Sequence, residues 1–431
     1  MMTQAPLPDW KNIFSAMWHK PLSDAELAAP WHSEDETAGW LSRSLWSLAL
    51  IAIWRSRLVP STQKTAWFPD FFCNSALYAL RLTGFKLVFY PLTPQLEPDM
   101  VACRELAKTT PPDIFLLVHY FGRPVEASIA SDFCRHFGSW LVEDAAHVLR
   151  PLAGVGTTGD FVIYSPHKLL PIPDGSVLVV RPNGPSKLTP ALILSLGSPS
   201  TWAGQLDELL KKSNASIIRS QVLARSWLAK RVLQKLGVRR LIGPATFTEI
   251  EQSKQLATQN LIAPPLSRVA CRLLGGLIGD LGLVTRSRQR HQLLLDALLF
   301  EDEGNYDGSL RLGERSEGRT WTPYLGAYQF DSISHAEAGY DLLQAKGLPV
   351  TTWPDLPPEV KQHKERHANA WQLRHTRIYM PVHQNVNMAG MLKDHQLRAQ
   401  PLDTEDLIRI VWDDASPEQW SDWMVKAGPV L

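Results

Sequence analysis

The stretch DIFLLVHYFGRPVEASIASDFCRHFGSWLVED, residues 113–144, decides the fold class. It holds two short apolar runs, 113–120 and 139–144, on either side of a helical pattern at 125–138. Two strands joined by a helix run parallel, because the crossover returns the chain to the same edge of the sheet. Both runs are apolar with little alternation, which is typical of parallel strands covered by helices on both faces. The stretch therefore predicts a parallel α/β sheet.

The same alternation extends over much of the first 180 residues. Further strands are predicted at 65–72, 86–92, 161–166 and 176–180, and helices at 38–57, 74–84 and 98–109. The last two strands follow one another without a helix, so we expect part of the sheet to be antiparallel. The predicted fold is α/β, with a mostly parallel central sheet flanked by helices.

Composition divides the chain into three predicted parts. Residues 1–30 lack periodicity and are expected to form an N-terminal arm. Residues 31–299 are expected to form a large domain, and residues 300–431, which begin polar and turn-rich, a smaller C-terminal α/β domain. A long amphipathic helix is expected at 286–299. Its solvated face is predicted to carry Arg286, Arg288 and Arg290.

Charge and cysteine spacing argue against several classes of function. The formal net charge is +1, so no global field favours nucleic acid or an anionic membrane. The four cysteines are not spaced as metal ligands, and we expect reduced thiols and no metal site. The apolar run 44–54 is shorter than the about 18 residues of a membrane span, so a buried helix is expected. The first residues lack the features of a secretory signal, which favours a cytoplasmic location.

Chemically active side chains follow two neighbouring predicted strands. Asp144 ends one strand and His147 comes directly after it, and Lys168 follows the next strand. Ligands of open parallel sheets bind beyond the carboxyl ends of the strands, where these side chains are expected to meet. A lysine can form an imine with an aldehyde, and a carboxylate can hold a pyridine nitrogen protonated. This combination of residues indicates pyridoxal phosphate chemistry.

Five segments in register resemble the DegT/StrS aminotransferases, a branch of the fold-type I pyridoxal-phosphate enzymes. They are FPDFFCNSALYALRLTGFKLVFY (68–90), LLVHYFGRPVE (116–126), GSWLVEDAAH (138–147), GTTGDFVIYS (156–165) and HKLLPIPDGSVLVV (167–180). The resemblance implies that Asp144 pairs with the pyridine nitrogen and that His147 contacts the ring hydroxyl. It further implies that Lys168 forms the imine and that Ser165 binds the phosphate.

The resemblance also implies a phosphate cradle in the segment LSRSLW (41–46), formed by Ser42, Arg43 and Ser44 at the start of a helix. Arg43 stands where the family has glycine. Cys73 stands where the family has an aromatic ring that stacks on the cofactor, and it is expected to line the ring face. The step from the phosphate serine to the lysine is two residues shorter than in the family. This chain is therefore a divergent example of the pattern.

The function that the resemblance implies is amino transfer from an amino acid donor to a keto sugar linked to a nucleotide, by a homodimer with sites at its interface. Two alternatives stay open. The first is a dehydratase or lyase of the same fold, whose members usually carry histidine in place of the lysine; His167 is adjacent to Lys168. The second is a non-catalytic relative that acts as a binding module. His119 is expected to be structural, and His383 to lie in a proline-rich turn rather than in the site.

Overall fold

The computed structural model describes residues 5–18, 22–59, 64–213, 216–237, 260–300, 310–312, 320–345, 348–353 and 355–386. The end of the predicted C-terminal domain, residues 387–431, and most of the segment 300–320 lie outside these ranges. Within them, no helix is long and apolar enough to cross a bilayer.

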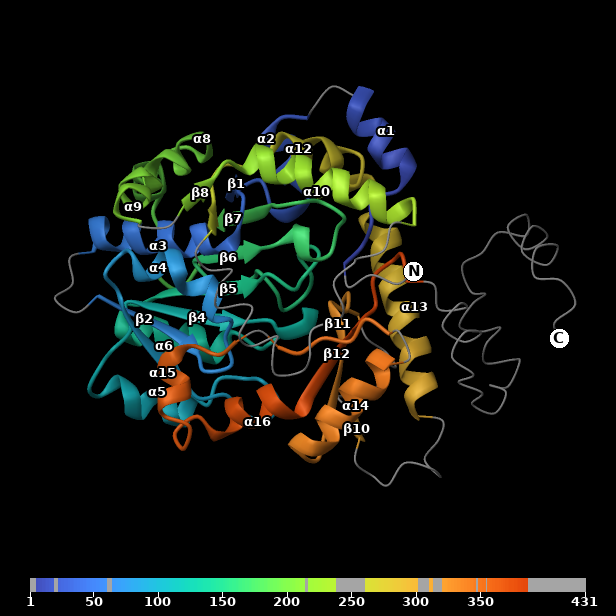
Figure 1. Ribbon diagram of the computed structural model, residues 1–431. Coiled ribbons are helices and arrows are strands. Elements are labelled where there is room, and N and C mark those ends of the chain that lie inside the picture. Colours follow the sequence, from blue (N-terminus) through green and yellow to red (C-terminus); the bar gives the residue numbers. More distant parts are fainter. Residues whose placement is uncertain are drawn as a thin grey trace, which may run out of the picture.

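A seven-stranded sheet forms the centre of the molecule (Figure 1). Its order is β1 (Thr37–Leu41), β7 (Ser176–Val180), β6 (Phe161–Tyr164), β5 (Trp140–Ala145), β4 (Ile114–Val118), β2 (Thr65–Pro69) and β3 (Lys86–Tyr90). Strands β3, β2, β4, β5 and β6 are mutually parallel, whereas β7 runs antiparallel to both β6 and β1. The predicted α/β class and its antiparallel portion are confirmed.

The predicted helix at 38–57 is wrong at its beginning. Residues 37–41 form the edge strand β1, and helix α3 begins only at Ser44 and ends at Leu58. The pairing of β1 with β7 satisfies backbone groups that a sequence pattern cannot assign, because the two strands lie far apart in the chain. The helix itself is buried over most of its length, as the apolar run predicts.

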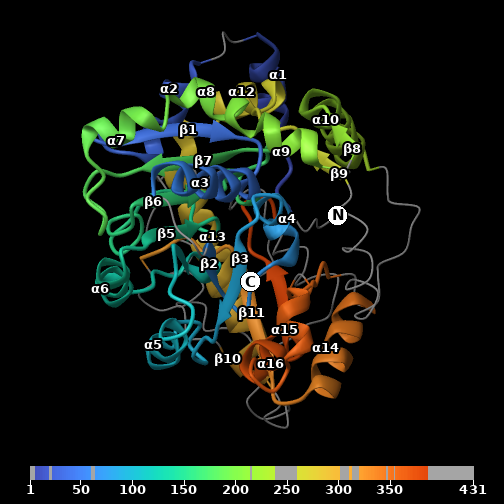
Figure 2. The same cartoon turned by 90° about the vertical axis from the view of Figure 1, so that its left-hand side faces the viewer.

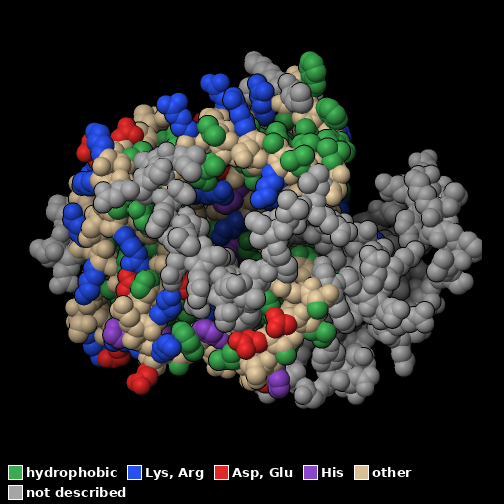
Figure 3. All heavy atoms as spheres, in the orientation of Figure 1, with side chains coloured by type: hydrophobic (Ala, Val, Ile, Leu, Met, Phe, Trp, Pro, Cys, Tyr) green, Lys and Arg blue, Asp and Glu red, His purple; other side chains and the backbone are tan. Residues whose placement is uncertain are grey.

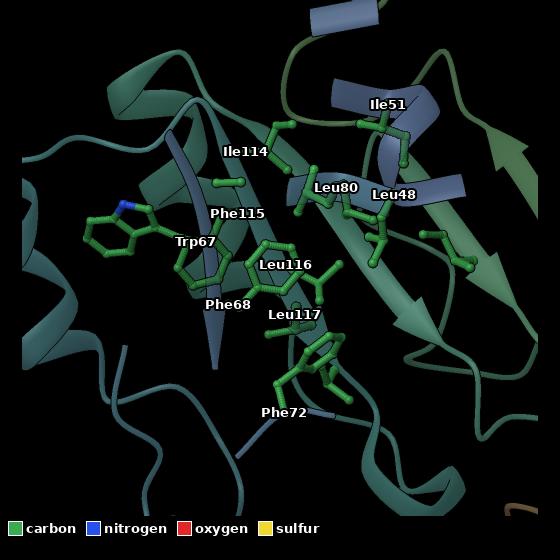
Figure 4. Close-up of a cluster of buried hydrophobic side chains, with 14 of the residues drawn as sticks. Leu48, Ile51, Trp67, Phe68, Phe72, Leu80, Ile114, Phe115, Leu116 and Leu117 are labelled. Carbon is green, nitrogen blue, oxygen red and sulfur yellow. The ribbon is translucent and has the colours of Figure 1, made fainter. Parts of the chain in front are cut away.

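The largest core lies between the parallel strands and the helices beside them (Figure 4). Leu48 and Ile51 of α3 face Leu80 of the short helix α4 (Tyr78–Arg81) and the apolar strands β2 and β4. Helix α5 (Met100–Ala107) packs on the edge strand β3, and helix α6 (Ser128–Phe137) packs on the central strand β5. Every residue of β4 and β5 is buried, which fixes the positions of the residues at the strand ends.

A second sheet is three-stranded and antiparallel, with the order β10 (Leu310–Leu312), β11 (Leu325–Phe330) and β12 (Arg377–Pro381). Helices α14 (Ile333–Ala345) and α16 (Ala368–Thr376) pack on it (Figure 2). This part of the molecule has its own apolar core. Helix α13 (Leu281–Phe300) packs against β11. Near the N-terminus, α1 (Trp10–Trp18) and α2 (Asp24–Ala28) both pack against α12 (Arg268–Gly275).

Candidate active site

Asp144 and Lys168 lie at the same edge of the central sheet. Asp144 is the penultimate residue of β5. Lys168 ends a short 3₁₀ turn, Pro166–Lys168, that follows the parallel strand β6. Asp144 is buried, and its Oδ1 accepts a hydrogen bond of 2.9 Å from the N–H of Ala146. Burial raises the pKa of Asp144, and the nearby amine of Lys168 acts in the opposite direction. The topology thus brings together the two residues that the sequence placed 24 positions apart.

The amine of Lys168 interacts with Asp144 without touching it. Desolvation lowers the pKa of Lys168, and the Asp144 carboxylate opposes this effect. Among the residues that the structure describes, none forms an ion pair within 4.0 Å with this amine. Its Nζ instead lies 6.0 Å from the centre of the Tyr324 ring. A lowered pKa increases the share of the neutral, nucleophilic amine at neutral pH.

The imidazole of His147 lies between two parallel rings. Its centroid is 4.4 Å from that of Tyr324 and 5.8 Å from that of Phe121, with interplanar angles of 12° and 18°. Its Nδ1 accepts a hydrogen bond of 3.3 Å from the N–H of Phe121, so the neutral ring carries its proton on Nε2. Burial lowers the pKa of His147 well below its ordinary value. His147 is therefore a neutral ring that offers one N–H donor.

An uncommon backbone turn sets this stack. Phe121 has a φ of 57°, in the left-handed region that side chains other than glycine rarely adopt, and Gly122 follows with a φ of 92°. A Cβ on Gly122 would lie 2.3 Å from the carbonyl oxygen of Thr322, so only glycine fits. The carbonyl of Phe121 accepts a hydrogen bond of 3.0 Å from the N–H of Tyr324. The turn after β4 thus fixes the segment that carries Tyr324.

Arg288 joins this segment to the turn that carries Lys168. It is buried in α13 and donates to the carbonyl oxygens of Pro323 at 3.2 Å, Tyr324 at 3.1 Å and Leu169 at 2.9 Å. Burial lowers the pKa of Arg288 to about 10. One guanidinium therefore holds together two backbone segments that lie more than 150 positions apart in the chain.

The predicted solvated arginine face is wrong for Arg288, although Arg286 and Arg290 are exposed as expected. Val284 and Gln292, four residues before and after Arg288, are also buried and share its helix face.

The predicted phosphate residues have unequal environments. Ser165 is fully buried, and its Oγ has no hydrogen-bond partner among the described residues. Ser44 is the first residue of α3, and Arg43 is its half-buried N-cap. Ser42, by contrast, donates its hydroxyl proton to the carbonyl oxygen of Ala263 at 2.6 Å, so this proton is already used within the protein.

Arg43 extends along the chain segment that follows Lys168. One Nη donates to the carbonyl oxygen of Pro173 at 3.0 Å, and the Asp174 carboxylate attracts the guanidinium. Burial lowers the pKa of Arg43, with Asp174 opposing, and the cation is close enough to lower the pKa of Lys168 as well. A positive group thus stands at the start of α3, where the helix dipole also favours an anion.

Cys73, the predicted ring-face residue, follows β2 and is half-buried. Its Sγ lies 3.0 Å from Oγ of Ser75, and its thiol is close enough to influence the pKa of both Lys168 and Tyr324. Burial raises the pKa of Tyr324 to about 12. Tyr324, which comes from the segment before β11, was not among the residues predicted for the site.

His119 is part of the scaffold below the site. Its Nδ1 accepts from the N–H of Val125 at 3.0 Å, and its Nε2 donates to Oε2 of Glu143 at 2.9 Å. Glu143 also accepts hydrogen bonds from backbone N–H groups of the loop 156–159. Burial raises the pKa of Glu143, but His119 and these donors outweigh it and lower the pKa overall. The pair fixes two loops that flank Asp144.

A hollow near the middle of the face seen in Figure 3 exposes Lys or Arg and His side chains, next to residues that are not described.

Among the described residues, no group of three His, Cys, Asp or Glu side chains could hold a metal ion. His383 is buried, and its Nδ1 accepts from the N–H of Asn385 at 3.2 Å.

No family model and no curated protein matches the sequence. Solved structures match over most of both chains. The PseC aminotransferase of Helicobacter pylori, involved in pseudoaminic acid biosynthesis, is 11% identical with a TM-score of 0.59, over 91% of this chain and 96% of that one. The putative sugar aminotransferase Spr1654 of Streptococcus pneumoniae is 12% identical with a TM-score of 0.58, over 92% and 99%. A DegT/DnrJ/EryC1/StrS aminotransferase of Brucella abortus is 12% identical with a TM-score of 0.55, over 91% and 90%.

This chain has the same fold as these three aminotransferases. Its similarity to them extends over both sheets, since it covers about nine-tenths of the chain. The identity is low throughout, so the comparison shows the fold alone.

Proposed function

We propose that this protein is a pyridoxal-phosphate-dependent aminotransferase that moves an amino group from an amino acid donor such as glutamate to a keto sugar carried on a nucleotide. One observation carries the proposal. Asp144 and Lys168 lie at the ends of adjacent parallel strands, close enough to shift each other's pKa and yet without an ion pair. A flat ring held between a carboxylate and an amine needs this arrangement, because each group acts on a different atom of the ring.

The residues present fit pyridoxal phosphate. Ser165 has a buried hydroxyl that finds no partner in the described part of the chain, which suits a phosphate oxygen, and Arg43 and the first turn of α3 add positive potential nearby. Ser44, at the first position of that helix, is a further phosphate contact in this proposal. Cys73 would line one face of the cofactor ring. Its small side chain has no aromatic ring, so it would not stack on the cofactor.

When bound, pyridoxal phosphate supplies an aldehyde that condenses with amines and a ring that takes up electrons. The chain supplies the proton chemistry. Nζ of Lys168 would remove the proton from Cα of the amino donor and return a proton to the product side, and its lowered pKa keeps part of the amine neutral for this role. Oδ1 of Asp144 already accepts from Ala146, and the second carboxylate oxygen is available to a protonated ring nitrogen.

His147 would orient the ring rather than carry protons. It is neutral, and its hydrogen bond from Phe121 leaves Nε2–H as a donor to the ring hydroxyl oxygen. The rings of Phe121 and Tyr324 keep the imidazole from rotating, so the direction of this donor is fixed.

The geometry disfavours the dehydratase alternative, in which His167 would replace Lys168. Nδ1 of His167 lies 2.8 Å from the carbonyl oxygen of Gly175, and burial lowers its pKa well below the ordinary value. Among the two adjacent residues, it is the amine of Lys168 that interacts electrostatically with both Asp144 and His147.

The proposed division into residues 1–30, 31–299 and 300–431, the homodimer and the cytoplasmic location accompany this proposal. Light scattering of the full chain tests the dimer.

Borohydride reduction followed by mass spectrometry tests the proposed function. Full-length protein with pyridoxal phosphate should give one reduced adduct, located on Lys168, and an absorption band that the Lys168→Ala variant lacks. Lys86→Ala is the matched control, because Lys86 is an exposed lysine on the edge strand β3. A protein that stays colourless and unlabelled overturns the proposal and supports the non-catalytic binding module. An adduct on Lys168 with no amino transfer from glutamate supports a lyase of the same fold, whereas cofactor binding without an adduct on Lys168 supports the dehydratase class.

A further inference from the structure

Helix α1 presents a second apolar face to solvent. Its inner face packs through Ile13 and Ala16 into the core around α12. On the opposite face, Trp10, Phe14 and Trp18 are 40%, 56% and 82% exposed. These three residues are spaced four apart, so they form one continuous stripe about 12 Å long. Three large aromatic side chains in water on one short helix are not explained by the core of this chain.

The stripe continues onto helix α10 (Ser220–Lys235). Nζ of Lys235 lies 5.7 Å from the Trp10 ring and 3.5 Å from Oδ1 of Asp9, so the end of α10 contacts the start of α1. Leu233 and Leu236, on either side of this lysine, are exposed. We name Trp10, Phe14, Trp18, Leu233 and Leu236 the α1–α10 surface. Figure 3 shows hydrophobic side chains gathered at the top of the molecule, where Figure 1 places these helices, with Lys and Arg beside them.

The surroundings of the α1–α10 surface carry more basic than acidic residues. Helices α1, α10 and α12 contain one, four and two basic residues, respectively, and no acidic residue, whereas Asp9 precedes α1 and Asp24 and Glu26 lie in α2, which packs on α12. The basic residues are Lys11, Arg225, Lys230, Arg231, Lys235, Arg268 and Arg272. The formal net charge of the whole chain is only +1, so positive charge is concentrated on this side of the molecule.

We infer that the α1–α10 surface binds an anionic membrane surface, with α1 lying in the plane of the interface. Exposed Trp and Phe on one helix face, flanked by Lys and Arg, are the features of interfacial helices. Charge decides between this occupant and a second copy of the chain. A two-fold symmetric contact would bring the same basic helices face to face, whereas anionic headgroups supply the opposite charge. This inference does not depend on the proposed transferase activity.

Flotation of the full-length protein with lipid vesicles tests this inference. The wild type should bind vesicles of phosphatidylcholine and phosphatidylglycerol mixed at about three to one, and bind phosphatidylcholine alone weakly. Binding should fall as salt is raised. The triple variant Trp10→Ser, Phe14→Ser, Trp18→Ser should lose about tenfold or more of the bound fraction at limiting lipid. The charge variant Arg225→Glu, Arg268→Glu, Arg272→Glu should lose binding to the anionic vesicles selectively.

A matched control removes exposed apolar side chains elsewhere. The triple variant Ile129→Ser, Leu194→Ser, Leu342→Ser changes exposed residues of α6, α7 (Pro190–Ser195) and α14, and should bind like the wild type. Circular dichroism checks that each variant is folded. If the aromatic variant does not fold, the charge variant still tests the inference. Equal binding by the aromatic variant and the wild type overturns the inference. The inference is also overturned if the aromatic variant loses a dimer that the wild type forms in light scattering while its vesicle binding stays unchanged. The α1–α10 surface would then be a subunit interface.

Discussion

The ring of Tyr324 lies parallel to the ring of His147, with centroids 4.4 Å apart and 12° between the planes. The same tyrosine ring lies 6.0 Å from Nζ of Lys168. A residue from the segment before β11 thus contacts two residues that follow strands of the central sheet. Its main chain is fixed by Arg288 and by Phe121, so the position of the ring depends on both parts of the fold.

Replacing Tyr324 separates the role of the ring from that of the hydroxyl. Tyr324→Ala should lower the free energy of unfolding by about 2 kcal/mol and weaken pyridoxal phosphate binding, because His147 loses the nearer of its two stacking partners. Tyr324→Phe keeps the ring and should stay within about 0.5 kcal/mol of the wild type. Urea unfolding and a cofactor titration followed by absorbance measure the two effects. Equal damage by Phe and Ala would show that the hydroxyl, not the stack, matters.

The unpartnered hydroxyl of Ser165 predicts a separation of stability from cofactor binding. Ser165→Ala should leave the free energy of unfolding of the cofactor-free protein unchanged within about 0.5 kcal/mol, because no protein hydrogen bond is lost. Pyridoxal phosphate affinity should fall about tenfold, the value of one hydrogen bond to a charged group. Ser176→Ala is the control. Its Oγ donates to the carbonyl of Tyr164 at 2.8 Å, and its loss should cost about 1 kcal/mol of stability. A stability loss in Ser165→Ala that matches the control would contradict the phosphate role.

Arg288 should be far more sensitive to substitution than its neighbours on α13. Arg288→Met leaves the buried carbonyls of Leu169, Pro323 and Tyr324 without their donor, and we expect a loss of about 3 kcal/mol or more in the free energy of unfolding. Arg290→Met removes an exposed side chain and should change it by less than about 0.5 kcal/mol. Denaturant midpoints measured at equal protein concentration compare the two. Similar midpoints would mean that these carbonyls do not need the guanidinium.

The lowered pKa of Lys168 predicts the pH dependence of its reactivity. The neutral amine is the reactive form, so labelling by a small amine-reactive reagent should begin at lower pH for Lys168 than for the exposed Lys86 in the same sample. Asp144→Asn removes the carboxylate that favours the ammonium form, and the Lys168 curve should then move to still lower pH. Mass spectrometry after timed labelling gives both curves. An unchanged Lys168 curve in Asp144→Asn would mean that Asp144 lies too far away to act on the amine.

Several features of the site could be predicted from the sequence because they depend on local pattern. The apolar runs predict the strands β4, β5 and β6, and parallel pairing brings their ends to one edge of the sheet. This is why Asp144, His147 and Lys168 are found together. The mostly buried helix α3 was predictable for the same reason, since its apolar run is continuous.

Other features could not be predicted from the sequence, because they arise where segments that are distant in the chain pack together. The edge strand β1 depends on its pairing with β7. The hydrophobic pattern of residues 37–41 does not by itself predict a strand. The burial of Arg288 depends on carbonyl groups from two other segments. The protonated nitrogen of His147 depends on the turn at Phe121.

By itself, the sequence determined the α/β alternation and the residues that stand at the carboxyl ends of the strands, because hydrophobic period and strand length are local properties. Only the tertiary structure decided that Tyr324 stacks on His147, that Ser165 is left without a partner and that three aromatic rings of α1 face solvent. These are relations between segments brought together by packing, and packing satisfies or leaves open each side chain according to neighbours that lie far away in the chain.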